Sequence, residues 1–146
     1  MSDRTLADLV KLNQARFQAE QVKLRDITMA EARLRKAVAD LEEHHRAAQD
    51  LQRGDIQGHR SIGGDVLWQG WVGRSRRSLQ IHLAQVLVQK GQKLQALQRA
   101  HGRKLASETL LDDASATQRK QSEKIKIEQE QRLILLNEAR RRGLPD

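Results

Sequence analysis

Apolar residues recur at alternating steps of four and three along the first fifty residues of this chain. The steps start at Leu6 and reach fourteen positions, nine of them apolar. A repeat of this kind is typical of a helix that packs against a partner helix in a left-handed supercoil. Ser2, Asp3 or Thr5 can cap its start. The pattern predicts a helix over about residues 5–53. The fourteen positions are Leu6, Val10, Asn13, Phe17, Glu20, Leu24, Ile27, Glu31, Leu34, Val38, Leu41, His45, Ala48 and Gln52.

A second helix is expected over about residues 74–141, because no proline occurs before Pro145 and Gly143 provides a stop. Its seam is predicted to weaken between His101 and Lys124 and to return further on. The apolar seam positions are Leu79, Leu83, Val86 or Leu87, Leu94 and Leu97, followed by Ile125, Ile127 and the run from Leu133 to Leu136.

Residues 54–73 separate the two helices and hold both tryptophans and six of the nine glycines. Glycine interrupts helices, so this segment is predicted to be the tip of a hairpin. The expected fold is all-α: a long antiparallel two-helix coiled-coil hairpin with a Gly/Trp-rich tip, forming a single domain over residues 1–146. A parallel dimer of straighter helices is the rival arrangement.

Charge favours the hairpin. If the helices fold back on each other, residues 38–53 lie beside about 74–90. Four acids then face four cations, which disfavours wrong registers even though exposed pairs are weak. The acids are Asp40, Glu42, Glu43 and Asp50, and the cations are Arg74, Arg76, Arg77 and Lys90.

Composition indicates an elongated helical protein. The chain has only three aromatic residues (Phe17, Trp68 and Trp71) and no cysteine. It has no secretion signal and no apolar run long enough to span a membrane, so a cytoplasmic location is expected. The whole net charge of +8 falls in residues 74–146, and no acid lies between Asp65 and Glu108. Such a field favours an acidic protein or polyanionic partner.

Motifs for chemistry are missing, so we expect no enzymatic activity, no cofactor and no small-molecule substrate. His44 and His45 are adjacent, whereas helical metal ligands need i,i+3 or i,i+4 spacing. Gly63-Gly64 lacks the context of a phosphate-binding loop. No serine has a supporting His/Asp constellation. We therefore predict no catalytic, cofactor-binding or metal-binding residue.

Trp68 and Trp71 are the strongest candidates for binding a protein partner. At i,i+3 spacing they share one helix face. They either plug the top of the seam or remain partly exposed to a partner, and tryptophan is enriched at binding hot spots.

The chain resembles FliJ, the coiled-coil component of flagellar type III export, and its injectisome relatives of the YscO type. The resemblance rests on the 146-residue length, the leading Leu6-Ala7-Asp8-Leu9 segment, the Trp68-Gln69-Gly70-Trp71 pair and the Leu/Gln-rich second helix with its basic C-terminus. It implies a stalk that inserts into the hexameric export ATPase and links it to the membrane export gate and to export chaperones. The protein would then be peripheral at the inner membrane through these partners only. The glycine-rich break departs from the family pattern.

The resemblance also implies two sets of binding residues. The export gate would contact Val38, Leu41, His45, Ala48, Trp68, Trp71, Leu79 and Leu83. The export ATPase would face the cations of the C-terminal arm, namely Arg119, Lys120, Lys124, Lys126, Arg132, Arg140, Arg141 and Arg142.

Two other functions fit the sequence. One is a generic coiled-coil scaffold or chaperone. The other is a nucleic-acid binder that uses the acid-free stretch 66–107. Nucleic acid is disfavoured because the cations are interleaved with the apolar seam rather than clustered before it.

Overall fold

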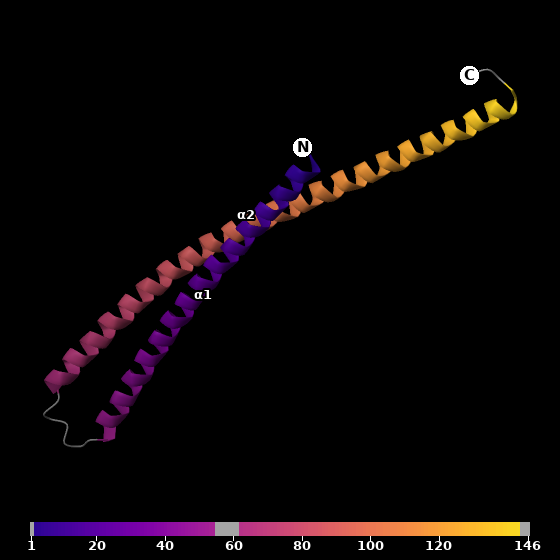
Figure 1. Ribbon diagram of the computed structural model, residues 1–146. Coiled ribbons are helices and arrows are strands. Elements are labelled where there is room, and N and C mark those ends of the chain that lie inside the picture. Colours follow the sequence, from indigo (N-terminus) through magenta and orange to yellow (C-terminus); the bar gives the residue numbers. More distant parts are fainter. Residues whose placement is uncertain (1, 55–61, 144–146) are drawn as a thin grey trace. The chain divides into compact units, whose positions relative to one another are not determined.

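A computed structural model describes residues 2–54 and 62–143, and the statements below concern these residues. The structure is all-helical, with α1 spanning Asp3–Gly54 and α2 spanning Ile62–Arg141 (Figure 1). Contacts divide the chain into two compact units, which are described separately. The single domain over residues 1–146 stays a prediction. Unit 1 comprises Met1–Arg16 and His101–Asp146, and unit 2 comprises Phe17–Ala100.

Both helix ends in unit 1 are capped as their residues predict. The amide of Thr5 donates to Ser2 Oγ (3.3 Å), which makes Ser2 the N-cap of α1. Gly143 has a φ of 66° and its amide donates to the Arg140 carbonyl (3.3 Å). This left-handed conformation after the last turn of α2 is typical of a glycine cap.

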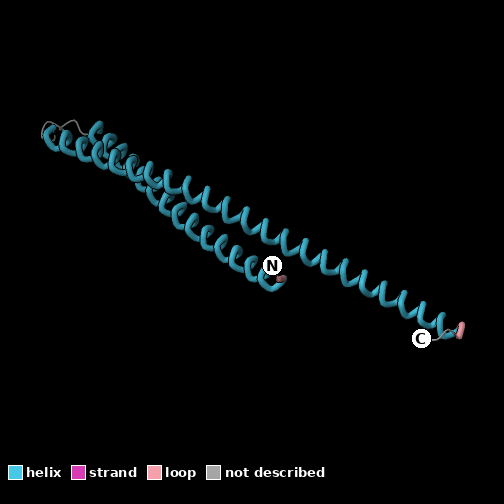
Figure 2. Tube along the Cα trace, turned by 90° about the horizontal axis from the view of Figure 1, so that it is seen from above, coloured by secondary structure: helices cyan, strands magenta, loops and turns pink. Residues whose placement is uncertain are grey.

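In unit 2 the two helices pack side by side and run antiparallel (Figures 1 and 2). Three contacts set the direction, because the partner number falls as the α1 number rises. Lys90 pairs with Glu31 (2.6 Å), Arg76 with Glu42 (2.7 Å), and Gln52 donates to Asp65 (2.5 Å). The antiparallel prediction is confirmed for this unit.

The expected register was wrong by two to three turns. Arg76 does contact one of the predicted acids, Glu42, but Lys90 contacts Glu31, which lies outside the predicted 38–53 segment. The error follows from the start of α2. That helix begins at Ile62 instead of about 74, so each α2 residue lies further from the turn than the sequence suggested.

The glycines of the expected tip therefore lie largely inside α2. The predicted tip ran over 54–73, of which residues 55–61 lie outside the described residues. Glycine costs a helix interior only about 1 kcal/mol relative to alanine, and packing can outweigh this. Val72, at 2% exposure, is the most buried hydrophobic residue described. The burial of Val72 favours a helix across this segment. Asp65 adds to it, because an acidic side chain in the first turn interacts favourably with the positive end of the helix dipole.

The packed face of α1 matches the predicted stripe. In unit 2 every stripe position from Phe17 to Ala48 is buried or half-buried, and in unit 1 the same holds for Leu6, Val10 and Asn13. Only Gln52, the last of the fourteen, is exposed. The 4–3 repeat therefore located the face of α1 that packs.

The packed face of α2 differs from the prediction, because it includes cations. Leu79, Leu83, Val86 and Leu97 lie on it as expected. Of the alternatives Val86 and Leu87, only Val86 packs, since Leu87 is 41% exposed. Leu94 is 42% exposed and is wrong as a seam position. The α2 residues of unit 2 that are buried or half-buried are Asp65, Gly70, Val72, Ser75, Arg76, Leu79, Leu83, Val86, Lys90, Lys93, Ala96, Leu97 and Ala100.

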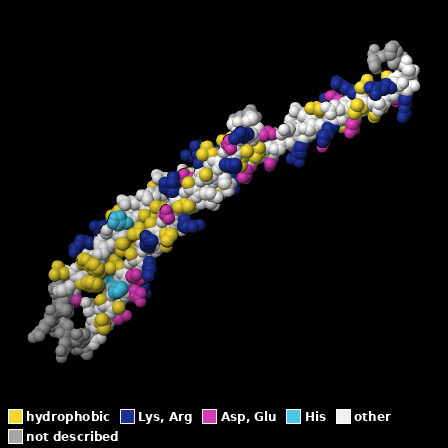
Figure 3. All heavy atoms as spheres, in the orientation of Figure 1, with side chains coloured by type: hydrophobic (Ala, Val, Ile, Leu, Met, Phe, Trp, Pro, Cys, Tyr) yellow, Lys and Arg dark blue, Asp and Glu magenta, His cyan; other side chains and the backbone are white. Residues whose placement is uncertain are grey.

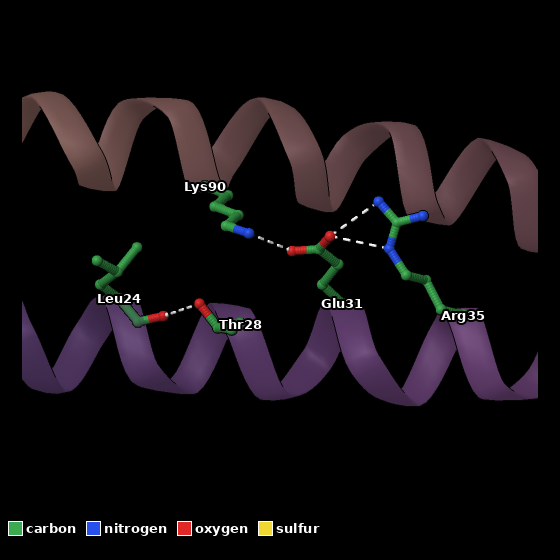
Figure 4. A network of polar contacts seen from close by, with 5 residues as sticks. All are labelled: Leu24, Thr28, Glu31, Arg35 and Lys90. Carbon is green, nitrogen blue, oxygen red and sulfur yellow. Dashed lines mark hydrogen bonds and ion pairs between the residues drawn. The ribbon is translucent and has the colours of Figure 1, made fainter.

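A charged cluster at the centre of unit 2 explains one of these cations. Glu31 is 8% exposed and lies between Lys90 of α2 and Arg35 of its own helix (Figure 4). The hydrogen bond from Lys90, followed by that from Arg35, holds the pKa of Glu31 below its ordinary value of 4.5. A buried carboxylate needs such partners, because it is costly to desolvate alone.

In unit 1 the start of α1 packs against residues 101–115 of α2. Leu6 is 7% exposed, Ser107 is 2% exposed, and Asn13 Nδ2 donates to the Arg103 carbonyl (3.3 Å). Every residue from 116 to 138 is exposed. The predicted return of the seam at Ile125, Ile127 and Leu133–Leu136 is therefore wrong within the described residues, because α1 ends before it can cover them. We call residues 116–141 the C-terminal segment.

Substituting Val72 tests the seam. Val72→Ala removes two buried methyl groups and should lower the free energy of unfolding by about 1–1.5 kcal/mol. Val88→Ala is a matched control on the same helix, because Val88 is 63% exposed; it should change stability by less than about 0.5 kcal/mol. Chemical denaturation followed by circular dichroism measures both. Equal effects would contradict the assigned face.

The Glu31 cluster should make stability depend on pH. Because its pKa is lower folded than unfolded, its contribution is present above pH 4.5 and is lost as the pH falls through the lowered folded value. Glu31→Gln should therefore melt below the wild type at neutral pH, and the difference should shrink as the pH falls below 4.5. Glu43→Gln, at an exposed position of α1, is the control. A constant difference across this range would refute the role.

Candidate protein-binding site on unit 2

Two stacked indoles mark the surface of unit 2 near the start of α2. The rings of Trp68 and Trp71 lie 5.1 Å apart between centroids with an interplanar angle of 22°. Their i,i+3 spacing on a continuous helix brings them onto one face, as the sequence predicts. Trp68 is 36% exposed and Trp71 is 48% exposed. A large part of each indole is thus open to solvent.

The indoles line an open groove between α1 and α2, which we call the Trp groove. Its volume is about 650 Å³. Figure 3 shows hydrophobic side chains gathered on this part of the surface, beside histidine and acidic side chains. The groove is lined by Ala37, Asp40, Leu41, His44, Trp68, Trp71, Ser75, Ser78 and Leu79.

Polar groups at the groove are few and partly committed. His44 Nδ1 donates to the Asp40 carbonyl (2.6 Å), which holds the imidazole against its own helix. Asp40 supplies the only carboxylate among the lining residues. A mainly apolar concave surface with a few convergent polar groups is typical of a binding site.

The eight predicted gate-binding residues separate into two groups. Leu41, Trp68, Trp71 and Leu79 meet in the Trp groove. Val38, His45, Ala48 and Leu83 are half-buried on the packed faces and do not line it. His45 accepts a hydrogen bond from Gln49 Nε2 at its Nε2 (3.0 Å).

The predicted gate-binding set leaves out five of the lining residues. Ala37, Asp40 and His44 lie within one turn of Leu41, and Ser75 and Ser78 lie one and two turns beyond Trp71. Most of these residues lie three or four positions from a predicted one, so adding the helical neighbours of each predicted residue identifies them. They were overlooked because they are small or polar.

Charge changes sign close to the groove. Residues 37–52 of α1 carry four acids and one basic residue, Arg46. Along the groove, α2 carries Arg74, Arg76 and Arg77 between the lining residues, and after Asp65 it has no acid until Glu108. Arg76 is partly neutralised by Glu42 (2.7 Å). The aromatic surface thus lies at a boundary between acidic and basic surfaces.

The predicted arm cations all lie in unit 1 and are all exposed. Lys and Arg side chains are distributed along this part of α2 in Figure 3. They do not converge on one point, so they form a basic surface rather than a pocket.

Metal-ligand clusters and membrane-spanning helices were looked for in the described part of the chain as well. No three His, Asp or Glu side chains gather there to hold a metal ion. Neither described helix includes a segment that is apolar enough and long enough to cross a bilayer.

No family model matches this chain, and no curated protein or solved structure is detectably similar to it. By its fold the protein belongs to the all-α class, with two long helices packed against each other.

The glycines beside the indoles should control local stability. An added Cβ at Gly73 would meet nothing within 4 Å, so Gly73→Ala should stabilise the start of α2 by about 0.5–1 kcal/mol. Hydrogen exchange of residues 64–74 should slow. Gly91→Ala has equal space in the same helix and is the control; it should leave exchange in 64–74 unchanged. Faster exchange in Gly73→Ala would contradict the helical assignment of this segment.

Proposed function

We propose that this protein is a non-enzymatic coiled-coil adaptor of a type III protein export apparatus of the flagellar kind. It would link the export ATPase ring to the cytoplasmic part of the membrane export gate and to export chaperones. Two binding surfaces are assigned: the Trp groove for the gate, and the arm cations for the ATPase.

The observation that supports the proposal most is the exposure of Trp68 and Trp71 (36% and 48%) over an apolar groove. Large aromatic side chains are costly to leave in water, and exposed clusters of them mark protein interfaces. The position of the groove also fits. It lies between residues 37–44 of α1 and residues 68–79 near the start of α2. In the family that the chain resembles, the gate is expected to bind the end of the first helix and the start of the second.

The basic C-terminal segment is the second support. Its exposed cations form a surface of one predominant sign, which steers encounters with an acidic partner. Long-range attraction of this kind does not demand a single docked orientation, and that suits a helix inside a ring of repeated subunits.

Binding to purified partners tests both assignments. Trp68→Ala with Trp71→Ala should weaken binding to the gate's cytoplasmic domain at least about a hundredfold, as loss of two hot-spot residues does. Binding to the export ATPase should be unchanged. Ile81→Ala is the control, because Ile81 is 52% exposed on the same helix but does not line the groove. Isothermal calorimetry measures the affinities.

Charge reversal in the C-terminal arm tests the second surface, the one proposed for the ATPase, independently of the Trp groove. Arg140→Glu with Arg141→Glu should weaken ATPase binding and leave gate binding intact. Arg74→Glu with Arg77→Glu reverses two exposed cations of unit 2 and is the charge-matched control. If neither partner binds the wild-type protein at physiological salt, the proposed function is wrong.

A further inference from the structure

The two walls of the Trp groove carry charges of opposite sign that the protein itself does not pair. Asp40 lines the α1 wall of the groove. Arg74 lies beside the α2 wall, because it comes three residues after Trp71 and four before Ser78, which both line the groove. Asp40 and Arg74 are exposed, and neither forms an ion pair with another described residue. Both charges are therefore open to a third element.

The opposite edge of the seam differs, because its charges are matched within the protein. Glu42 of α1 and Arg76 of α2 form an ion pair there (2.7 Å). Residues two positions apart on a helix point about 160° apart, so Asp40 and Arg74 lie on the other side of their helices from this pair. The two helices thus neutralise each other at one edge of the seam and leave the groove edge unpaired.

The apolar surface of the groove continues toward the end of α1 and the start of α2. Residues eleven positions apart lie within about 20° of each other, because eleven residues make about three turns. Leu67 comes eleven residues before Ser78, and Leu51 comes eleven residues after Asp40. Leu67 and Leu51 are 75% and 77% exposed, so each extends one wall of the groove. From Leu67 to Leu79 the α2 wall is about 18 Å long, the length of three to four helical turns.

A helix fits this surface better than an extended peptide does. The backbone groups of α1 and α2 are already paired within each helix, so they offer no hydrogen bonds to the backbone of a strand. A bound helix pairs its own backbone and buries only side chains in the groove. Ala37, Ser75 and Ser78 are small lining residues, so a third helix can approach the other two closely.

We propose that the Trp groove binds an amphipathic helix of a partner protein, about three to four turns long, with cations on one flank of its apolar stripe and acids on the other. The apolar stripe packs on the two indoles, the cationic flank pairs with Asp40, and the acidic flank pairs with Arg74. This deepens the proposed function and rests on it in one respect, namely that the Trp groove is a protein-binding surface.

Charges of both signs select the occupant and its direction. The indoles supply most of the affinity, whereas the charges decide which helix binds. A helix with one sign on both flanks meets a like charge at one wall, and this weakens its binding. A helix with two different flanks binds in one direction only, because turning it end for end exchanges the flanks.

Fluorescence can follow binding in the groove alone, because Trp68 and Trp71 are the only tryptophans of the chain. Three synthetic peptides of about fifteen residues, or about four turns, serve as probes. They contain no tryptophan and share one stripe of leucine and alanine. Their flanks carry lysine on one side and glutamate on the other, lysine on both, or glutamate on both. Burial of the indoles by a bound peptide should shift the emission of the full chain to shorter wavelength.

The peptide with two different flanks should bind the wild-type chain about fivefold more tightly than either peptide of a single sign. Asp40→Lys should reverse this order, so that the glutamate peptide binds about fivefold more tightly than the mixed one. Arg74→Glu should likewise favour the lysine peptide by about fivefold. Because each peptide is titrated into several proteins, differences in the helicity of the free peptides cancel.

Arg77→Glu is the matched control. Arg77 is an exposed cation two positions from both Ser75 and Leu79, so it points away from the groove and should leave the order of the three peptides unchanged. Asp40→Lys retains the backbone carbonyl that His44 contacts, and circular dichroism checks that each variant stays helical.

Three outcomes would overturn the proposal. The first is equal affinity of the three peptides for the wild-type chain, and the second is no shift of the emission with any peptide. The third is a blue-shifted emission that appears without peptide as the chain dimerises in sedimentation equilibrium, because a second copy then occupies the groove. No export component enters these titrations. Selective binding of the mixed peptide, together with no binding of the purified gate, would support the helix site and refute the export function.

Discussion

Two helices that pack as a pair share only one seam, and this limit governs the rest of the molecule. Each helix can turn roughly two positions in seven toward its partner, and every other position faces water. Only Leu6, Val72 and Ala100 are buried hydrophobic residues in the described structure. The remaining apolar side chains in the described structure are half-buried or exposed. Surfaces that are rare on a globular domain, such as the stacked indoles and the Leu133–Leu136 run, are therefore available here for binding.

The stripe of α1 could be predicted because burial and spacing are linked by geometry alone. The 4–3 repeat found Asn13 and Glu31 as packed positions despite their polarity. The same approach failed for α2, where only apolar residues were counted and Lys90 and Lys93 were passed over. Their flexible apolar stems can cover a seam while the ammonium group reaches its edge or a buried acid. The ion pair between Glu31 and Lys90 shows that a charged residue can pack on one helix when the other helix supplies its partner.

Local propensity misplaced the start of α2. Glycine predicts a stop, but residues 62–73 belong to α2, and within them Val72 is buried. The prediction that the two indoles share one helix face still holds, because residues at i,i+3 spacing lie on the same face wherever the helix begins. The groove around it could not be foreseen, since Asp40 and His44 come from the other helix and their approach depends on the register. The greater length of the second helix predicts an overhanging C-terminal end, yet the seam expected at Ile125, Ile127 and Leu133–Leu136 is wrong for a related reason. An apolar pattern indicates a need for a partner without saying whether the same chain supplies it.

The polar residues within the seams affect how stability changes with temperature. Unfolding usually raises the heat capacity, because apolar surface becomes hydrated, while newly exposed polar surface lowers it. Asn13, Glu31 and Ser107 are the buried polar residues beside only three buried hydrophobic ones. The heat-capacity change per residue is consequently smaller than in a globular domain of the same length. A small change flattens the curve of stability against temperature, so cooling strengthens or weakens these helix pairs only slightly.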